Sequence, residues 1–156
     1  MQFIDTHCHI YDEAFDEDRQ QVIERAKKNN VLQFVLPNVD LTTTDRLFSL
    51  PKTDKSFFPL MGVHPTSVNE NVEKDLQMIK SFFDKQRIYG IGEVGLDFYW
   101  DKTFKDEQIY AFCEQMKWSE ERNNLPIVIH CRKAFDDALA CLKKRNKKTY
   151  NGIFNC

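Results

Sequence analysis

The chain has 156 residues, of which 42% are hydrophobic, 29% charged and 13% aromatic. This composition supports a buried core and excludes an intrinsically disordered tail. The formal net charge of −2 excludes a protein that coats nucleic acid through a global positive field, so a local site has to hold any polyanion. Five glycines and five prolines exclude collagen-like and low-complexity character.

The cysteines and the N-terminus both indicate the cellular setting. Five cysteines occur without a C-x-x-C pair, and the first residues contain neither the basic nor the apolar segment of a signal peptide. No apolar run approaches the roughly 18 residues needed to cross a bilayer. We therefore expect a cytoplasmic protein with no membrane partner.

Short apolar runs alternate with longer segments of helical period, a pattern typical of βα units and not of a helical bundle or a sandwich. The apolar runs predict strands over residues 2–6, 32–36, 58–61, 87–91, 127–129 and 152–154. The segments between them predict helices over residues 17–28, 72–85, 104–121 and 134–145.

The spacing of these elements predicts the fold class. Strand starts recur every roughly 25 to 40 residues, close to the ~31 residues per unit of an eight-unit barrel. We predict an α/β fold of the TIM-type (β/α)8 barrel, incomplete, with about five to six parallel strands and flanking helices. No linker interrupts residues 1–156, which we assign to one domain. An open barrel leaves two unpaired edges, so we also expect self-association through them.

The sharpest chemical signal lies at the end of the first predicted strand, Asp5-Thr6-His7-Cys8-His9. Alternate residues of an extended segment project to the same side, so His7 and His9 can share a divalent metal ion. Asp5 is then placed to orient one imidazole from behind. Cys8 projects to the other side and is read as a small buried side chain.

Further polar residues follow the later predicted strands. His64 follows the third strand, Glu93 and Asp97 follow the fourth, and His130 and Arg132 follow the fifth. The carboxyl ends of parallel strands form one rim of a barrel, where the active sites of such folds lie. We therefore expect these side chains to meet the two N-terminal histidines.

The ligand types at this rim suit zinc, manganese or magnesium without any thiolate. Glu93 lies between Gly92 and Gly95, which are expected to let the backbone turn sharply on either side of it, and its carboxylate can bridge two ions. The predicted metal ligands are His7, His9, Glu93 and His130.

Other residues at the rim suit contacts with a negatively charged oxygen. Arg132 offers a guanidinium fork and His64 an imidazole donor, with a salt bridge and a loop cap as the less favoured alternatives. Asp97 is placed to position water, a substrate hydroxyl or Arg132. We predict Glu93, His64 and Asp97 as catalytic residues and His64 and Arg132 as substrate-binding residues.

Three aromatic residues, Phe98, Tyr99 and Trp100, follow Asp97. Aromatic side chains beside a phosphate-binding site either stack on a base or cover the mouth of the barrel. We expect them to cover it.

Four motifs in chain order together resemble the TatD family of metal-dependent deoxyribonucleases, which are amidohydrolase-like barrels. The resemblance also includes Phe104, Gln108, Phe112 and Gln115. The motifs are Asp5-x-His7-x-His9, Gly62-Val63-His64-Pro65, Gly92-Glu93-Val94-Gly95-Leu96-Asp97-Phe98-Tyr99 and Pro126-x-x-Ile129-His130-x-Arg132.

This resemblance implies a hydrolase that cleaves phosphodiester bonds in DNA, at 3′ ends or in single strands, with two divalent ions (Mg, Mn or Zn). It places the two N-terminal histidines on one ion, Glu93 between the ions and His130 on the second. It further implies that His64 and Arg132 contact the substrate phosphate.

The chain departs from the family pattern in two respects. Asn155 stands in Gly152-Ile153-Phe154-Asn155-Cys156, where the resemblance implies a ligand histidine, and so marks a degenerate metal position. An amide oxygen suits a hard cation but replaces imidazole poorly on zinc. The metal-binding aspartate implied on a later strand is not among these residues. We therefore expect the two-ion set to be at most partly retained and nuclease activity to be impaired.

Two further interpretations stay open at this level. Barrels with the same H-x-H entry also act on other ester or amide substrates, so the chain is alternatively a metal-dependent hydrolase of that kind. It is otherwise a catalytically inactive remnant that binds a partner.

Overall fold

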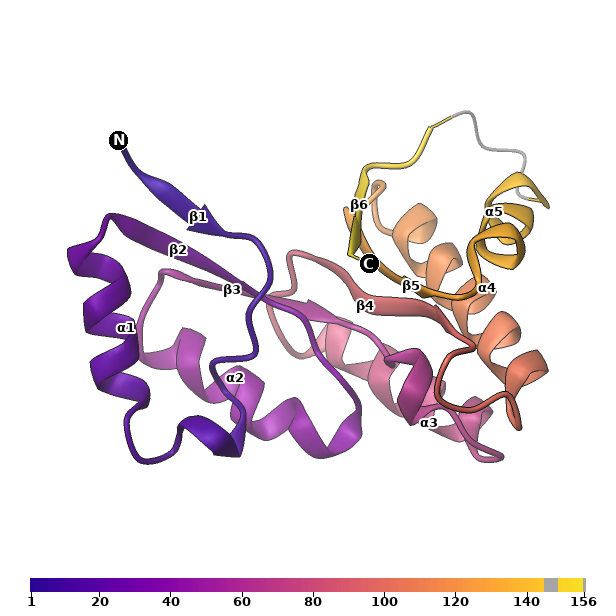
Figure 1. Cartoon of the computed structure of the whole chain (residues 1–156), viewed down its shortest axis with the longest axis horizontal. Helices are drawn as coiled ribbons and strands as arrows, with labels where there is room; N and C mark the ends of the chain where they lie inside the picture. The colour runs from indigo at the N-terminus through magenta and orange to yellow at the C-terminus, as the bar shows by residue number, and fades with distance from the viewer. Residues whose placement is uncertain (145–148, 156) are drawn as a thin grey trace.

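The computed structural model describes residues 1–144 and 149–155. Its six strands form one sheet in which each strand pairs in parallel with the next along the chain. The sheet curls, and β1 and β6 lie at its two open edges (Figure 1). The incomplete (β/α) barrel is therefore confirmed. Its strands are β1 (Phe3–Asp5), β2 (Val31–Leu36), β3 (Phe57–Met61), β4 (Gly90–Asp97), β5 (Ile127–Arg132) and β6 (Gly152–Asn155).

The main helices lie along the outer side of the curled sheet (Figure 1). They are α1 (Arg19–Lys28), α2 (Thr44–Thr53), α3 (Val72–Lys80), α4 (Lys105–Glu121) and α5 (Phe135–Lys144). The end predicted for the last helix, residue 145, lies outside the described residues. Within the described part of the chain, none of these helices combines the length and apolar character that spanning a bilayer requires.

The helix α2 is absent from the sequence prediction, and α3 is shorter than predicted. Only Thr44, Leu47 and Phe48 of α2 are buried, and Pro51 lies inside its last turn. The proline in the last turn argues against a helix at the level of sequence, whereas packing of the buried side chains against the sheet favours one. The α3 helix ends at Lys80, and a 3₁₀ turn, Ser81–Asp84, follows it.

The strand β4 differs most from its prediction, because it begins later and continues through the glycine-containing segment to Asp97. Gly95 has φ +139°, and a Cβ there would lie 2.0 Å from the carbonyl oxygen of His130. Only glycine permits this close approach of β5. Glu93 and His130 therefore lie within strands, and the backbone change expected beside Glu93 takes the form of a shift in the β4–β5 register between Ile91 and Val94.

The two faces of the sheet are packed very differently. The outer face meets the helices, and side chains such as Leu36, Met61 and Leu96 are fully buried there. The inner face holds a groove of about 270 Å³ whose lining includes Ile4 at one edge and Ile153 at the other. The core of the molecule therefore lies between sheet and helices, and the concave side of the sheet is open.

Candidate metal centre

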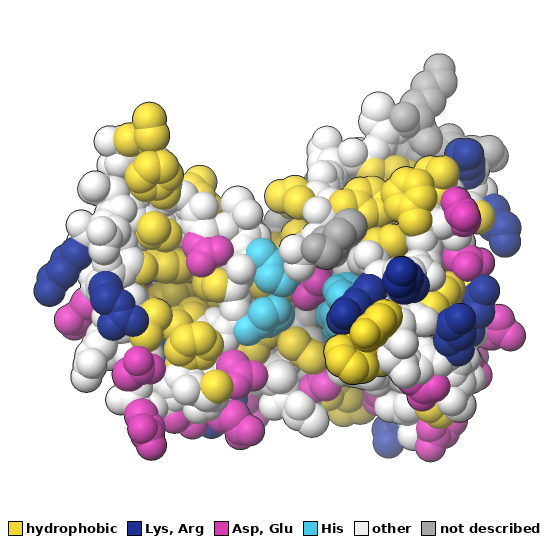
Figure 2. All heavy atoms as spheres, viewed as in Figure 1, with side chains coloured by type: hydrophobic (Ala, Val, Ile, Leu, Met, Phe, Trp, Pro, Cys, Tyr) yellow, Lys and Arg dark blue, Asp and Glu magenta, His cyan; other side chains and the backbone are white. Residues whose placement is uncertain are grey.

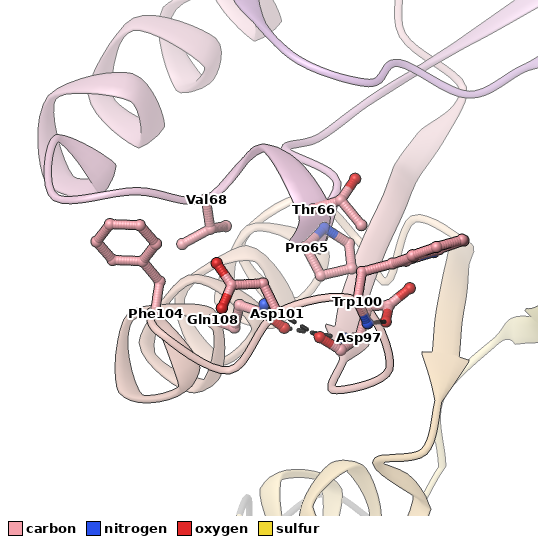
Figure 3. Close-up of a pocket in the computed structure, with 8 residues that line it drawn as sticks. All are labelled: Pro65, Thr66, Val68, Asp97, Trp100, Asp101, Phe104 and Gln108. Carbon is pink, nitrogen blue, oxygen red and sulfur yellow. Dashed lines mark hydrogen bonds between the residues drawn. The ribbon is translucent and has the colours of Figure 1, made fainter.

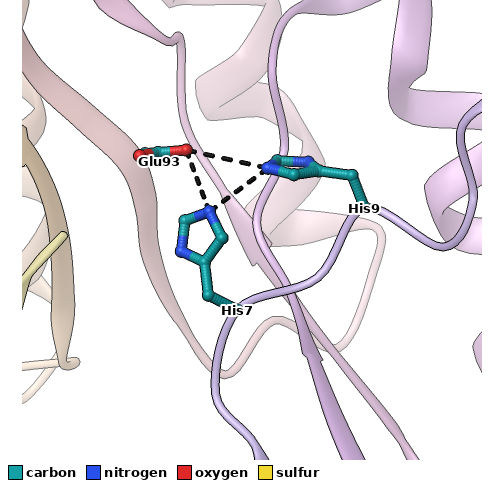
Figure 4. A group of neighbouring side chains, drawn as sticks. All are labelled: His7, His9 and Glu93. Atoms are coloured by element: carbon teal, nitrogen blue, oxygen red, sulfur yellow. Dashed lines mark hydrogen bonds and ion pairs between the residues drawn. The ribbon is translucent and has the colours of Figure 1, made fainter. Parts of the chain in front are cut away.

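Glu93 is the centre of a cluster of histidines and is itself only 3% exposed. Its Oε2 lies 3.1 Å from His7 Nε2 and 3.7 Å from His9 Nε2 (Figure 4). The same oxygen lies 3.9 Å from His64 Nε2, and Oε1 lies 3.3 Å from His130 Nδ1. The fold therefore brings the three predicted histidine ligands and His64 together around the carboxylate of Glu93, the fourth predicted ligand.

The cluster divides into two groups that share Glu93. One consists of His7, His9 and Glu93 and the other of His64, Glu93 and His130, with the potential ligand atoms within 4.8 Å of one another in each. The histidines gather at the middle of one face, in a hollow between two parts of the surface (Figure 2). This arrangement allows one carboxylate to bridge two sites.

A buried asparagine that follows β2 holds the backbone on which Glu93 is carried. Asn38 is fully buried; its N–H donates to the carbonyl of Gly92 at 3.0 Å, and its own carbonyl accepts from the N–H of Glu93 at 3.0 Å. Its side-chain amide donates to the carbonyl of Gly62 at 2.8 Å. Sequence analysis missed Asn38, although its place just beyond a buried strand was an available signal.

The chain after β1 leaves the extended conformation, because the strand ends at Asp5. The Asp5 carboxylate accepts from the backbone N–H of His7 at 3.1 Å, so it fixes the backbone of that residue and not its ring. The N–H of Cys8 donates to the carbonyl of Val35 at 3.1 Å. These bonds, and not strand alternation, bring His7 and His9 to Glu93.

Tyr11 defines the tautomer of His9. The Tyr11 hydroxyl donates its only proton to the carbonyl of Pro37 at 2.5 Å, so it must accept at its 2.8 Å contact with His9 Nδ1. His9 therefore carries its proton on Nδ1 and directs the lone pair of Nε2 toward Glu93. A metal-binding histidine usually has its other ring nitrogen bonded in this way, and the sequence analysis did not identify Tyr11.

His130 lies between two carboxylates. Its Nε2 is 2.9 Å from Asp97 Oδ2, and its Nδ1 faces Glu93. Burial lowers the pKa of His130, but its contacts with Glu93 and Asp97 outweigh burial and raise that pKa above its ordinary value. Burial raises the pKa of Glu93, yet hydrogen bonds from His130 and His7 bring that pKa below its ordinary value. His130 is thus oriented by Asp97 and presents Nδ1 to the centre.

His64 presents a donor to the cluster. The backbone N–H of Thr66 donates to His64 Nδ1 at 3.2 Å, so in the neutral ring the proton lies on Nε2, the atom that faces Glu93. Burial lowers the pKa of His64 to about 4, despite the opposing effect of Glu93. A neutral imidazole with Nε2–H suits a hydrogen bond to a substrate oxygen better than it suits a metal ligand.

Two glutamines of α4 hold the segments that carry His64 and Asp97. Gln108 accepts from the N–H of Asp97 at 2.9 Å and donates to its carbonyl at 3.2 Å. Gln115 does the same with Val63, at 2.6 and 3.2 Å. Each side-chain amide thus pairs with the backbone N–H and C=O of one residue at the rim. Because buried polar groups need such partners, α4 carries amides on its buried face.

Asn155, at the end of β6, reaches the same cluster. Its amide nitrogen donates to Glu93 Oε1 at 3.2 Å and lies 3.4 Å from His7 Nε2. The degenerate metal position of the sequence therefore lies beside two of the predicted ligands.

Arg132 is the exposed last residue of β5, two residues beyond His130. Its guanidinium carbon is 3.9 Å from the centre of the Tyr99 ring, and no ion pair joins it to another described residue. Phe98 is buried, whereas Tyr99 is 51% and Trp100 70% exposed. The expectation that these aromatic residues cover the barrel mouth stays a prediction, and Phe98 alone of the three is buried.

The thiol of Cys8 is not part of either group of potential ligands. Burial, with a smaller contribution from Asp5, raises the pKa of Cys8 to about 12, which disfavours the thiolate that metals bind. None of the described cysteines is in a disulfide.

The donor set fits a divalent cation. His9 Nε2 carries a lone pair and lies 3.2 Å from His7 Nε2, and both atoms lie beside the buried carboxylate of Glu93. Imidazole nitrogens that converge on a carboxylate oxygen form a mixed nitrogen and oxygen set, typical of zinc and manganese. Such a set can polarise a substrate oxygen or activate water.

Comparisons with known proteins agree with this geometry. The profile of the family described as TatD related DNase matches residues 4–156. The chain is 36% identical, over 97% of its length, to YabD of Bacillus subtilis, a metal-dependent hydrolase by name. It is 26% identical, over 97% of its length, to a protein of Cronobacter sakazakii named 3′-5′ ssDNA/RNA exonuclease TatD.

A solved structure gives the same result for the fold. The TatD homologue YjjV of Escherichia coli superposes with a TM-score of 0.83 at 25% identity, over 91% of this chain. The chain spans 59%, 57% and 55% of the lengths of these three relatives, respectively.

Proposed function

Because the chain belongs to the TatD related DNase family, we propose that its cluster is the centre of a divalent-metal-dependent hydrolase that cleaves phosphodiester bonds in DNA, at single strands or 3′ ends. The observation that supports this most is the convergence of four histidines on one buried glutamate, within 3.9 Å. Relatives named as exonucleases of single-stranded DNA and RNA favour a nucleic-acid substrate.

The proposed metal ligands are His7, His9, Glu93 and His130. The tautomer set by Tyr11 supports the role of His9 Nε2, and the bond to Asp97 supports the role of His130 Nδ1. Divalent ions held there would stabilise the attacking and leaving oxygens of the phosphodiester.

The remaining rim residues have separate roles in this proposal. His64 directs its Nε2–H to a phosphate oxygen, and Arg132 supplies a positive charge at the edge of the site. Both oxygens of Asp97 are engaged, one by His130 and the other by backbone N–H groups. Asp97 therefore acts through His130 as a positioning residue, and Glu93 and His64 are the catalytic residues.

Asn155 would bias the metal preference of this centre. Its amide nitrogen faces Glu93 and His7 in the metal-free chain, and an amide turned over would offer its oxygen as an additional ligand, which would suit Mg²⁺ or Mn²⁺ and not Zn²⁺. We expect Asn155→His to raise affinity for Zn²⁺ relative to Mn²⁺, as measured by calorimetry on the metal-free chain. An unchanged ratio of affinities would remove Asn155 from the ligand set.

Metal titration tests the site without relying on turnover. The purified chain should bind Mn²⁺ or Zn²⁺, and Glu93→Gln should weaken binding by at least about 100-fold, more than an outer partner typically contributes. The matched control is Glu17→Gln at an exposed position, which should bind as the unchanged chain does. A chain that binds neither ion would contradict the proposed centre and favour a non-catalytic binding module.

A digestion assay tests the substrate class. With Mn²⁺ or Mg²⁺, we expect trace digestion of labelled single-stranded DNA, because the chain spans only 55–59% of the relatives described above. The trace should vanish in His7→Ala. Hydrolysis of a cyclic amide in preference to the phosphodiester would favour the alternative, a metal-dependent hydrolase of another ester or amide.

We propose that residues 1–156 form the N-terminal portion of one barrel domain, which the coverage of the longer relatives supports.

By itself this chain pairs with a second copy through β1 and β6. That association is supported by exposed apolar side chains at both edges, including Ile4 and Ile153 at 54% and 52% exposure. The absence of disulfides among the described cysteines supports a cytoplasmic setting.

A further inference from the structure

Two adjacent aromatic side chains project from the rim next to the metal centre. Tyr99 and Trp100 are 51% and 70% exposed, while Phe98 immediately before them is buried. Their ring centroids lie 4.9 Å apart with an interplanar angle of 84°. Large aromatic side chains this exposed beside a polar site are unusual for packing and typical of ligand contact.

Arg132 joins the two rings into one surface. Its guanidinium carbon lies 3.9 Å from the Tyr99 centroid and 5.1 Å from the Trp100 centroid. Because no other described residue pairs with this charge, its N–H donors are available to an incoming anion. We call Tyr99, Trp100 and Arg132 the rim platform.

Hydrogen bonds hold the rim platform in place. Asp97 Oδ1 accepts from the backbone N–H of Tyr99 at 2.9 Å and of Trp100 at 3.4 Å. The N–H of Phe98 donates to the carbonyl of Arg132 at 2.9 Å. The two segments of the platform are therefore tied directly to each other and do not form a loose loop.

The platform is also close to the reacting centre. The other oxygen of Asp97 contacts His130, which faces Glu93. On its other side, Trp100 lines a small cavity of about 80 Å³ together with Pro65 and Thr66, which follow His64 (Figure 3). One carboxylate thus connects the platform to the cluster, and its aromatic surface adjoins the His64 loop.

We propose that the rim platform is a nucleobase-stacking subsite that holds single-stranded nucleic acid beside the metal centre. Aromatic faces accept any base, and the arginine contributes a charge for the neighbouring phosphate. A base can stack on Trp100 only after it has left the stack of a duplex, so the subsite favours single strands over an intact duplex. This inference rests on the proposed function because it deepens that function by naming the form of substrate.

Binding without metal tests the subsite separately from the hydrolase. The probe is a fluorescein-labelled thymidine oligonucleotide in EDTA, with an abasic oligonucleotide of equal length and charge as its partner. We expect the abasic probe to bind about 10-fold more weakly, because stacking on aromatic side chains is lost. Equal binding of the two probes, or no binding of either, would overturn the subsite.

Substitutions assign the effect to the platform. Trp100→Ala should weaken thymidine binding about 10-fold and leave abasic binding nearly unchanged. Arg132→Gln should weaken both probes and reduce the salt dependence. The matched control, Tyr110→Ala, removes an exposed aromatic residue from α4 (42% exposed) and should change neither. Equal thymidine binding by Trp100→Ala and the unchanged chain contradicts the proposal.

The intrinsic fluorescence provides an independent reading. The second tryptophan, Trp118, is only 2% exposed, so quenching by the thymidine probe should come from Trp100 and vanish in Trp100→Phe. If metal binding or digestion fails while base-dependent quenching persists, the proposed hydrolase is wrong and the subsite stands. If digestion occurs but Trp100→Ala changes neither binding nor quenching, the subsite is wrong and the hydrolase stands.

Discussion

The central and the edge strands of the sheet both contribute to one cluster, but they are held very differently. Every residue of β4 is buried, whereas residues of β1 and β6 are mostly exposed. Glu93 and His130 belong to the central strands. His7 and His9 follow one edge and Asn155 ends the other.

This difference teaches that the two halves of the centre depend on different forces. Neighbouring strands on both sides and the helices on the outer face hold β4 and β5, so the positions of Glu93 and His130 follow from the core. The edge histidines depend on a few hydrogen bonds, above all those through Tyr11 and Asp5. Substitutions in the central strands should therefore lower the stability most. Substitutions near the edge strands should change the metal affinity without unfolding the chain.

The largest expected effect is on stability. Leu96 in β4 is fully buried, while Ile153 in β6 is 52% exposed. We expect Leu96→Ala to lower the free energy of unfolding by about 3 kcal/mol, because it leaves a cavity in the core. Ile153→Ala should cost under ~1 kcal/mol. Urea denaturation of both variants measures this, and equal costs would contradict the contrast between centre and edge.

A smaller effect is expected at the edge histidines. Tyr11→Phe removes the acceptor for His9 Nδ1–H, so the ring is no longer held in the ligand tautomer. We expect Mn²⁺ affinity, measured by calorimetry, to fall roughly 10-fold or more. Tyr110→Phe at an exposed position is the matched control. Unchanged affinity in Tyr11→Phe would show that packing alone orients His9.

The pH dependence should distinguish the central half further. Because the pKa of His130 is raised in the folded, metal-free chain, protonation of His130 stabilises the fold. This contribution is fully present below pH 6.5, the ordinary pKa of histidine, and is lost as the pH rises through the raised pKa. Urea midpoints of the unchanged chain and of His130→Gln should therefore converge as pH increases above neutrality.

Metal binding should show the opposite trend over the same range. The proton on His130 must leave before the nitrogen can bind an ion, so affinity should increase with pH. His64, with its pKa lowered to about 4, does not titrate there. Midpoints that stay equally far apart at all pH values would contradict the proposed protonation of His130.

The smallest effect on the free energy of unfolding, within ~0.5 kcal/mol, is expected when Ile153→Lys places a charge on the open edge strand β6. Ile153→Lys should reduce self-association of the chain, because a lysine on an edge strand opposes pairing with another sheet. Light scattering with size-exclusion chromatography measures it, with Met78→Lys, an exposed position on α3, as control. Equal association of the unchanged chain and Ile153→Lys would remove the edges as the interface.

Sequence patterns predicted much of the sheet and the candidate ligands. Apolar runs at regular intervals indicated the six strands, and the positions of His7, His9, Glu93 and His130 near their carboxyl ends indicated one rim. Parallel strands joined by helices must bring those ends together, so spacing alone carries this information.

Other features could not be read from local patterns. The helix α2 contains a proline, and β4 continues through glycines because β5 approaches at Gly95. Asn38 and Tyr11 carry no motif, and their roles depend on hydrogen bonds to Gly92 and Pro37 far along the chain.

The amino-acid sequence by itself determined the alternation of strands and helices and the residue types at the rim, which follow from local periodicity and order along the chain. Its motifs also carried the resemblance to the family. Only the tertiary structure decided which nitrogen of each histidine faces Glu93, that Asp97 serves His130, and that Tyr99 and Trp100 are exposed beside Arg132. Proton positions and exposure depend on neighbours brought close by folding, and no local pattern contains them.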